Sequence, residues 1–263
     1  DDSDGAALDA LLEHGADTIL EQITASGLRG CGGAGFSTGS KWRLCRDSAA
    51  DQRYVVCNAD EGEPGTFKDR ILLHSYADRV FEGMTLCGGV IGADRGLLYL
   101  RGEYTYLEAL LEDILQKRRD AGLLGKNILG HEGVDFDIRI QMGAGAYVCG
   151  DETALIESCE GKRGTPRVKP PFPIQHGYLG QPTVVNNVET LAWVPCILSR
   201  GVDWFRNYGT ESSTGHKLFS VSSDCERPGV YEFPFGITIA ELLREVGGEK
   251  AKAVLVGGAS GQC

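Results

Sequence analysis

A glycine-rich loop near the start of the chain constrains the fold more than any other stretch. Residues 30–35 read Gly-Cys-Gly-Gly-Ala-Gly, which has the spacing G-x-G-x-x-G. In a dinucleotide-binding fold this spacing follows an apolar strand, whose carboxyl end aims the glycine turn at a pyrophosphate. Here residues 19–28 precede the loop, and their pattern is typical of a helix that closes on a glycine. The sequence therefore predicts either a phosphate-binding turn on a different scaffold or, on the motif alone, a flexible surface loop.

Charge and hydropathy exclude several classes of protein. The formal net charge of the 263 residues is −11, which disfavours nucleic-acid binding because that needs a basic surface. No apolar stretch approaches the roughly 20 residues of a membrane helix. The first residues are acidic, where a signal peptide needs positive charge. We expect a cytoplasmic protein that contacts neither nucleic acid nor a membrane.

The cysteines favour a reducing compartment. There are nine, an odd number without paired spacing, which argues against a disulfide framework. No C-x-x-C occurs, so we expect neither a zinc ribbon, nor an iron–sulfur run, nor any other metal site in this chain. Most of the thiols are expected to be small core residues.

Strand and helix patterns alternate along the chain, which predicts an α/β fold with a mainly parallel sheet. A basic, proline-rich connector spans residues 161–173, and the composition turns polar at 210–215. We expect an α/β domain over 1–210, with N-terminal helices in 1–28, and a small ββαβ domain over 214–263. The expected strands are 54–57, 96–101, 136–141, 217–222, 230–233 and 253–256; the expected helices are 8–14, 19–28, 38–48, 80–91, 103–119, 153–159, 188–200 and 239–246.

Acidic and amide side chains follow two of the expected strands. Residues 58–63 come directly after the first strand, and a glycine-rich segment ending in Gly150 follows the third. Binding loops gather at the carboxyl ends of parallel strands. The acids suit ribose hydroxyls, flavin ring N–H groups or Mg²⁺, although such a run is also typical of a solvated turn.

Further candidates have structural alternatives. Lys41, one turn into a helix, could face a phosphate, and Asp151 and Glu152 could serve as helix caps. One of Asn186 and Asn187 is expected to cap the helix that follows, which leaves the other for a ligand. The histidines show no metal or triad spacing, and no G-x-S-x-G elbow occurs.

Five segments resemble one known family. Residues 27–36, 57–68, 143–155, 168–173 and 182–190 are similar, in this order, to the FMN- and NADH-binding subunit of respiratory complex I and its soluble relatives. Residues 157–167 resemble most the diaphorase flavoprotein subunit of cytoplasmic NAD-reducing nickel–iron hydrogenases; NAD-dependent formate dehydrogenases carry a similar subunit.

The resemblance implies a Rossmann-like FMN-binding domain, a ubiquitin-like (β-grasp) domain and a C-terminal helical domain with a [4Fe–4S] cluster. The helical domain is absent from this chain, which we interpret as part of a longer subunit. The implied reaction is reversible hydride transfer between the nicotinamide and FMN, followed by single-electron transfer to iron–sulfur clusters. The implied partners are iron–sulfur electron-transfer subunits and a hydrogenase or formate dehydrogenase module.

The resemblance also implies the residues of the site. Two departures from the family pattern are Cys31, where Arg is usual, and Asp151, where Glu is usual. Glu63 and Glu152 are expected at the reaction itself. The FMN set is Gly30, Gly32, Gly33, Lys41, Asn58, Asp60, Glu61, Tyr147, Gly150, Asp151, Asn186 and Asn187, and the NAD set is Phe36, Glu63, Glu152, Lys169 and Phe172, with the aromatics stacking on adenine.

Three other functions stay open: the same subunit in formate dehydrogenase or complex I, a self-contained NAD-dependent dehydrogenase, and a non-catalytic assembly subunit without cofactor. A self-contained dehydrogenase would need a strand before Gly30 and a catalytic histidine or Lys–Tyr pair, and neither is found in this sequence. The intact set of Lys41, Asn187 and residues 58–63 argues against the assembly subunit.

Overall fold

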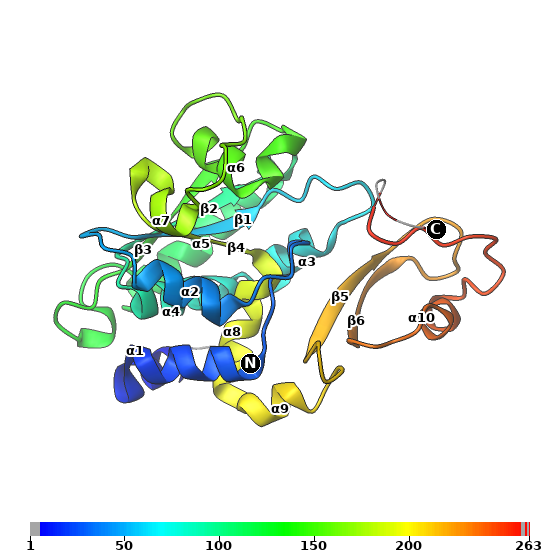
Figure 1. Cartoon of the computed structure of the whole chain (residues 1–263), viewed down its shortest axis with the longest axis horizontal. Coiled ribbons are helices and arrows are strands. Elements are labelled where there is room, and N and C mark those ends of the chain that lie inside the picture. Colours follow the sequence, from blue (N-terminus) through cyan, green and yellow to red (C-terminus); the bar gives the residue numbers. More distant parts are fainter. Residues whose placement is uncertain (1–5, 259–260, 262) are drawn as a thin grey trace.

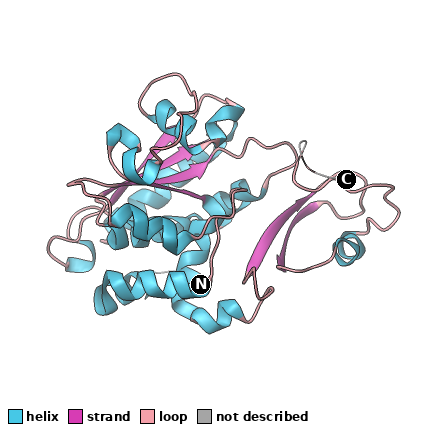
Figure 2. Ribbon diagram, viewed as in Figure 1, coloured by secondary structure: helices cyan, strands magenta, loops and turns pink. Residues whose placement is uncertain are grey.

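A computed structural model describes residues 6–258, 261 and 263. A four-stranded sheet lies between helices, and a hairpin with one helix forms a unit at the C-terminal side (Figure 1; Figure 2). None of the helices in these residues is both long and apolar enough to cross a bilayer. The helices are α1 (Ala6–Ser26), α2 (Thr38–Arg46), α3 (Lys68–Ser75), α4 (Ala77–Ile91), α5 (Thr105–Asp120), α6 (Glu152–Cys159), α7 (Pro173–His176), α8 (Val188–Arg200), α9 (Val202–Arg206) and α10 (Ile239–Val246).

The sheet is parallel throughout, as expected from the alternation of strands and helices. Its order is β3-β2-β1-β4, with β1 (Tyr54–Ala59) between β2 (Arg95–Leu100) and β4 (Thr183–Asn187), and β3 (Asp137–Met142) at one edge. Strand β4 was not expected from the sequence. It is short and ends in two asparagines, which are uncommon in strands. Its sequence therefore resembles an irregular segment before a helix.

The two faces of the sheet bury different sets of side chains, because alternate residues of a strand point to opposite faces. On one face, Val55 and Cys57 of β1 join a large core with α1, α4 and α8. On the other face, Tyr54 and Val56 pack with Leu155 and other residues of α6. The sheet is therefore covered on both sides, and ligand access is left to its ends.

The glycine loop follows a helix, as expected. α1 contains a break at Gly15 (φ 80°, ψ 162°), so it corresponds to the two predicted N-terminal helices. It ends at Ser26, and residues 27–29 lead into the loop, with Arg29 bridged to Ser37 on the loop's other side. Cys31, Cys57 and five further cysteines are buried, which confirms that most of the thiols are core residues.

The C-terminal unit begins as predicted. β5 (His216–Val221) pairs antiparallel with β6 (Gly229–Pro234), and α10 follows with a capping box between Thr238 and Glu241. The predicted strand over 253–256 is wrong, because only Val256 makes an isolated bridge there. Alternating Val and Leu residues suggested a strand, but these residues find no neighbouring strand to pair with among those described. The proposed boundary near 210–214 stays a prediction.

α4 and α8 pack so closely that one glycine decides their distance. A Cβ added to Gly83 would overlap the carbonyl oxygen of Leu191, which is backbone and cannot rotate away. Both helices pack against the sheet in the large core. Their crossing therefore sets where α8, and with it the end of β4, lies relative to β1.

We expect Gly83→Ala to destabilise the fold by about 1–3 kcal/mol through overpacking. This cost exceeds the gain of about 1 kcal/mol in helix propensity. Denaturant unfolding at equilibrium measures it. Gly229→Ala is the control, because its added Cβ would meet only the Tyr231 ring at 3.6 Å. Equal or higher stability of the Gly83 variant would contradict the close crossing.

Candidate functional site

The carboxyl ends of β1 and β4 meet at the point where the sheet changes its direction of growth. The chain adds β2 and β3 on one side of β1 and β4 on the other. Asn58 and Asn187 are direct neighbours in the register of β1 and β4. The loops after both strands leave the same carboxyl edge of the sheet, which is the edge at which α/β proteins bind ligands. We call the space beyond these two strand ends the crevice.

The glycine loop lies over the end of β4. The Gly30 N–H donates to the carbonyl of Phe36 at 2.9 Å, which closes the loop. Gly33 and Gly35 have φ of 114° and 63°, a conformation that favours glycine. A Cβ on Gly32 would lie only 3.2 Å from the Cβ of Asn187. The loop thus reaches the crevice from a helix rather than from a strand.

Lys41 projects from the first turn of α2 towards the same crevice. Ser37 caps this helix by accepting from the N–H of Ser40. The Lys41 Nζ donates to the carbonyl of Val185 at 3.0 Å and lies 3.5 Å from an oxygen of Glu152. The ammonium group is therefore held against the middle of β4, beside the start of α6.

Asn58 joins the loop after β1 to the loop before α6. Its amide nitrogen donates to the carbonyl of Gly150 at 2.9 Å, and its oxygen accepts from the N–H of Asp60 at 3.0 Å. One Asp60 oxygen is buried and has no hydrogen-bond partner among the described residues. Burial raises the pKa of Asp60 to about 6, although Arg101 opposes this shift. Asp60 is a polar acceptor that the described part of the protein leaves unsatisfied.

Glu61 has a structural position. Its carboxylate accepts from the N–H groups of Asp69 and Arg70 at 2.8 and 3.3 Å and from the hydroxyl of Tyr104 at 2.8 Å. It therefore caps the start of α3 from outside the helix. Burial and the nearby Asp69 raise the pKa of Glu61.

Glu63 and Tyr147 meet across two loops. The Tyr147 hydroxyl, on a side chain that is 64% exposed, donates to an oxygen of Glu63. Gly258 also approaches Glu63 so closely that an added Cβ would overlap the carboxylate. The C-terminal segment therefore lies beside this acid.

The start of α6 gathers two carboxylates and two lysines. Asp151 caps the helix, accepting from the N–H groups of Thr153 and Ala154 at 2.8 and 3.3 Å. Burial would raise the pKa of Asp151, but the hydrogen bonds from Thr153 outweigh it and the pKa is lowered. Lys169 Nζ lies 3.3 Å from Asp151 and 3.5 Å from Glu152, which also faces Lys41. Glu152 thus bridges a lysine of the α2 side and a lysine of the proline-rich connector.

Both asparagines at the end of β4 have hydrogen-bond partners in the protein. Asn187 caps α8, with its oxygen accepting from the N–H of Glu189 at 3.0 Å and its nitrogen donating to Asp69 at 2.7 Å. Asn186 is buried and accepts from the indole N–H of Trp42 at 2.8 Å. The expected helix cap is present. That the other asparagine contacts a ligand stays a prediction; its side-chain oxygen lies against Trp42, whose burial the sequence does not reveal.

The two phenylalanines of the predicted NAD set are about half exposed. Phe36 is 49% exposed at the end of the glycine loop, and Phe172 is 47% exposed in the connector. An exposed ring is available to stack on a planar ligand.

A buried ion cluster beneath the crevice was not expected from the sequence. Lys68 Nζ lies 2.7 Å from Asp69 and 2.8 Å from Glu189, and all three side chains are buried. Burial would lower the pKa of Lys68, but the two carboxylates raise it. Glu189 also accepts from the N–H of Leu218 in β5 at 2.8 Å. In the sequence, a Lys-Asp pair at the start of a helix is typical of an exposed ion pair, so the cluster is recognised only from the burial of its side chains in the structure.

The crevice therefore unites most of the predicted residues. Within the described part of the chain, His, Cys, Asp and Glu side chains form no group that could hold a metal ion. Contacts and register join residues at the two strand ends and the start of α6 directly, whereas Phe36 and Phe172 belong to the glycine loop and to the connector that carry Gly32 and Lys169. The residues joined are Gly32, Lys41, Asn58, Asp60, Gly150, Asp151, Glu152, Lys169 and Asn187.

Known proteins are similar to this chain in sequence. Subunit alpha of the NAD-reducing hydrogenase HoxS from Cupriavidus necator is 60% identical over 97% of this chain and 42% of its own length. A subunit of the NADH-quinone oxidoreductase of Rhizobium meliloti is 48% identical over 95% of this chain and 61% of its own length. The chain thus spans about half the length of these relatives.

The fold matches a solved structure. The crystal structure of an NAD⁺-reducing [NiFe]-hydrogenase in the H₂-reduced state superimposes with a TM-score of 0.84 and 50% identity, over 92% of this chain and 41% of that one. Residues 23–196 match the Nuo51 FMN-binding domain family. This match covers the glycine loop, the whole parallel sheet and most of α8. The chain belongs to the Nuo51 FMN-binding domain family.

Proposed function

We propose that this chain is the FMN- and NAD(H)-binding part of the diaphorase subunit of an NAD-reducing hydrogenase. The observation that carries the proposal is the pair of strands β1 and β4, beside which lie a glycine loop packed on Asn187, the Lys41 ammonium on the carbonyl of Val185 and, just after β1, an Asp60 oxygen without a partner among the described residues. Glycine N–H groups and a lysine suit a phosphate, and an unpaired buried acceptor suits a ring N–H. The residues present fit FMN.

In this proposal the residues divide by chemistry. Lys41 and Gly30, Gly32 and Gly33 hold the phosphate; Asn58, Asp60 and Gly150 face the flavin ring. Glu61, Asn186 and Asn187 shape its floor through the contacts described above. Tyr147 and Asp151 border the flavin. Glu63, Glu152 and Lys169 face the ribose hydroxyls of NAD(H), with Phe36 and Phe172 stacking on adenine.

When bound, FMN supplies a group that takes up a hydride and passes the electrons on singly. The protein supplies orientation and electrostatics, and the described site needs no general acid or base for hydride transfer. The acids at the crevice disfavour an anionic reduced flavin and so lower its midpoint potential towards that of NAD.

The remaining parts of the proposal concern the longer protein. β5, β6 and α10 begin a ubiquitin-like domain, and a helical [4Fe–4S] domain follows it. The partners are iron–sulfur electron-transfer subunits and a hydrogenase module, in the cytoplasm. The higher identity to HoxS subunit alpha (60%) than to the quinone oxidoreductase subunit (48%) favours hydrogenase over the alternatives, complex I and formate dehydrogenase.

Purified protein tests the proposal directly. We expect a flavin absorption spectrum that bleaches on addition of NADH. Lys41→Ala should weaken FMN binding about 10- to 100-fold, the worth of a charge-assisted hydrogen bond. Lys117→Ala, which removes a lysine paired only on the surface with Asp113, should not change it. A colourless protein that does not take up FMN would refute the proposal.

The charge of Glu152 should affect the flavin potential. Glu152→Gln removes a negative charge at the crevice, so we expect the midpoint potential to rise by roughly 20 mV for the two-electron couple, or about 1 kcal/mol. A spectroscopic redox titration measures it. Glu211→Gln, at an exposed position before β5, is the control. An unchanged or lower potential would contradict the electrostatic role.

Asp60 should make the flavin-free protein less stable as pH rises. Its folded pKa of about 6 exceeds the ordinary value of 3.8, so the folded state binds the proton more tightly and stability falls between pH 4 and 6. Asp60→Asn should reduce the loss of unfolding free energy over this pH range by about 1–2 kcal/mol. This is less than the full pKa shift would give, because solvent reaches part of the carboxyl group. Denaturant unfolding at pH 4 and 7.5 measures it, with the exposed Asp113→Asn as control. An equal pH dependence in both variants would contradict the burial of this charge.

A further inference from the structure

The proline-rich connector carries two residues of the proposed NAD site but forms almost no regular structure of its own. Residues 163–172 contain neither helix nor strand. Pro166, Pro170 and Pro171 have no N–H and cannot join a hydrogen-bond ladder. Lys169 is nevertheless placed within 3.5 Å of Glu152 and 3.3 Å of Asp151. Other contacts must therefore hold this segment against α6.

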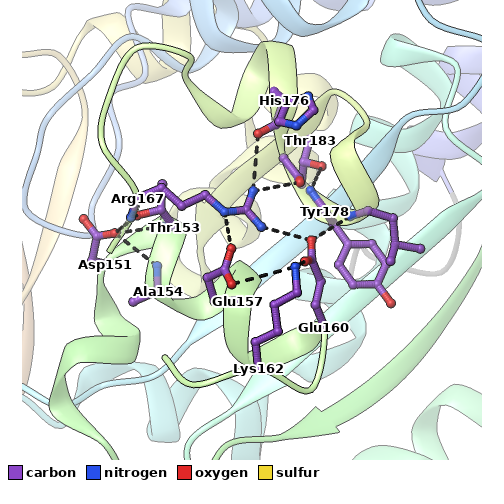
Figure 3. A network of polar contacts seen from close by, with 12 residues as sticks. Asp151, Thr153, Ala154, Glu157, Glu160, Lys162, Arg167, His176, Tyr178 and Thr183 are labelled. Carbon is purple, nitrogen blue, oxygen red and sulfur yellow. Dashed lines mark hydrogen bonds and ion pairs between the residues drawn. The ribbon is translucent and has the colours of Figure 1, made fainter. Parts of the chain in front are cut away.

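Arg167 makes those contacts (Figure 3). Its guanidinium pairs with Glu157 and lies 3.0 Å from Glu160, which are within and directly after α6. Its remaining donor side reaches the carbonyls of Gly177 at 3.0 Å and His176 at 3.4 Å. One planar group thus joins the connector to α6 and to the end of α7. A lysine ammonium has no such fork and cannot satisfy four acceptors in these directions.

The backbone of Arg167 completes a closed circuit with the site. Its N–H donates to Thr153 Oγ1 at 2.9 Å, and the Thr153 hydroxyl donates to one oxygen of Asp151 at 2.5 Å. The other Asp151 oxygen faces Lys169 at 3.3 Å. These hydrogen bonds run from Arg167 through Thr153 and Asp151 to Lys169, which follows Arg167 by two residues in the sequence. The position of Lys169 therefore depends on the contacts that hold Arg167 against α6.

The charges in this cluster balance. Glu157 and Glu160 face Arg167 and Lys162, whose ammonium lies 2.6 Å from Glu160. Burial would raise the pKa of Glu160, but hydrogen bonds from Lys162, Arg167 and the N–H of Leu179 outweigh it, so the pKa is lowered. Glu160 therefore stays ionised at neutral pH and keeps the guanidinium seated. Lys162 shares the acids but makes none of the contacts to residues 176 and 177.

We propose that Arg167 is a positioning residue for NAD(H) binding: it seats the connector on α6 and so places Lys169 beside Glu152. The inference rests on the proposed function, in which Lys169 faces the NAD(H) ribose. Arg167 itself touches only protein groups, so it acts through Lys169 and not on the ligand.

The first test is a double-mutant cycle on the FMN-loaded protein. Arg167→Lys should raise the KM for NADH about tenfold and change kcat less than about twofold, because it displaces a binding group without touching the reacting atoms. Lys169→Ala should raise KM similarly. In the Lys169→Ala background, Arg167→Lys should add less than about a twofold further change. Lys162→Ala is the matched control and should leave KM unchanged.

The second test needs neither FMN nor NADH. Hydrogen exchange of the peptide over residues 161–173, in the flavin-free protein, should be faster in Arg167→Lys and unchanged in Lys162→Ala. Unchanged exchange in Arg167→Lys, or KM effects of Arg167→Lys and Lys169→Ala that simply multiply, would overturn the inference. A wild-type protein that binds no FMN would instead refute the proposed function, and the exchange experiment would still decide whether Arg167 seats the connector.

Discussion

The parallel pairing of β1 with β4 is the constraint on which the rest of the structure depends. It joins segments more than a hundred residues apart and places Asn58 beside Asn187. Because β2 and β3 lie on the other side of β1, this pairing creates the one change of direction in the described sheet. The glycine loop, α2 and the start of α8 are all built against it. A shift by one residue would turn Asn187 to the opposite face and separate its amide from Asp69.

Much of the site consists of polar groups that the protein itself satisfies. Glu61 caps α3, Asp151 caps α6 and Asn187 caps α8, each with its own hydrogen bonds. These groups need no reorganisation when a ligand arrives, since their orientation is already fixed. The exception is Asp60, whose second oxygen has no partner among the described residues. In such a site, most polar groups are held in place by the protein, and a ligand binds to the few hydrogen-bonding groups that have no protein partner.

Local patterns predicted most of the elements, because helix and strand periods depend on neighbouring residues. α8 and α10 have the predicted bounds, and the parallel sheet follows from the alternation of strands and helices. The sequence could not reveal β4, since a five-residue strand is recognised by its partner and not by its own pattern. The strand expected at 253–256 failed for the converse reason: its residues have strand character but no paired strand among those described. The burial of Lys68 and the contact of Trp42 with Asn186 are likewise products of tertiary packing.

The glycine loop shows how the same motif can serve a different scaffold. In a dinucleotide fold the strand before the glycine loop fixes the direction of the loop. Here a helix precedes the loop, and later elements of the chain fix the direction of the loop. Gly32 packs on Asn187, and the N–H of Cys31 donates to Thr190 at 2.9 Å in α8. The loop is thus fastened to β4 and α8, which come much later in the sequence. The same strand positions Lys41 through the carbonyl of Val185, two residues before Asn187. One strand therefore organises both the backbone donors and the positive charge of the proposed phosphate site.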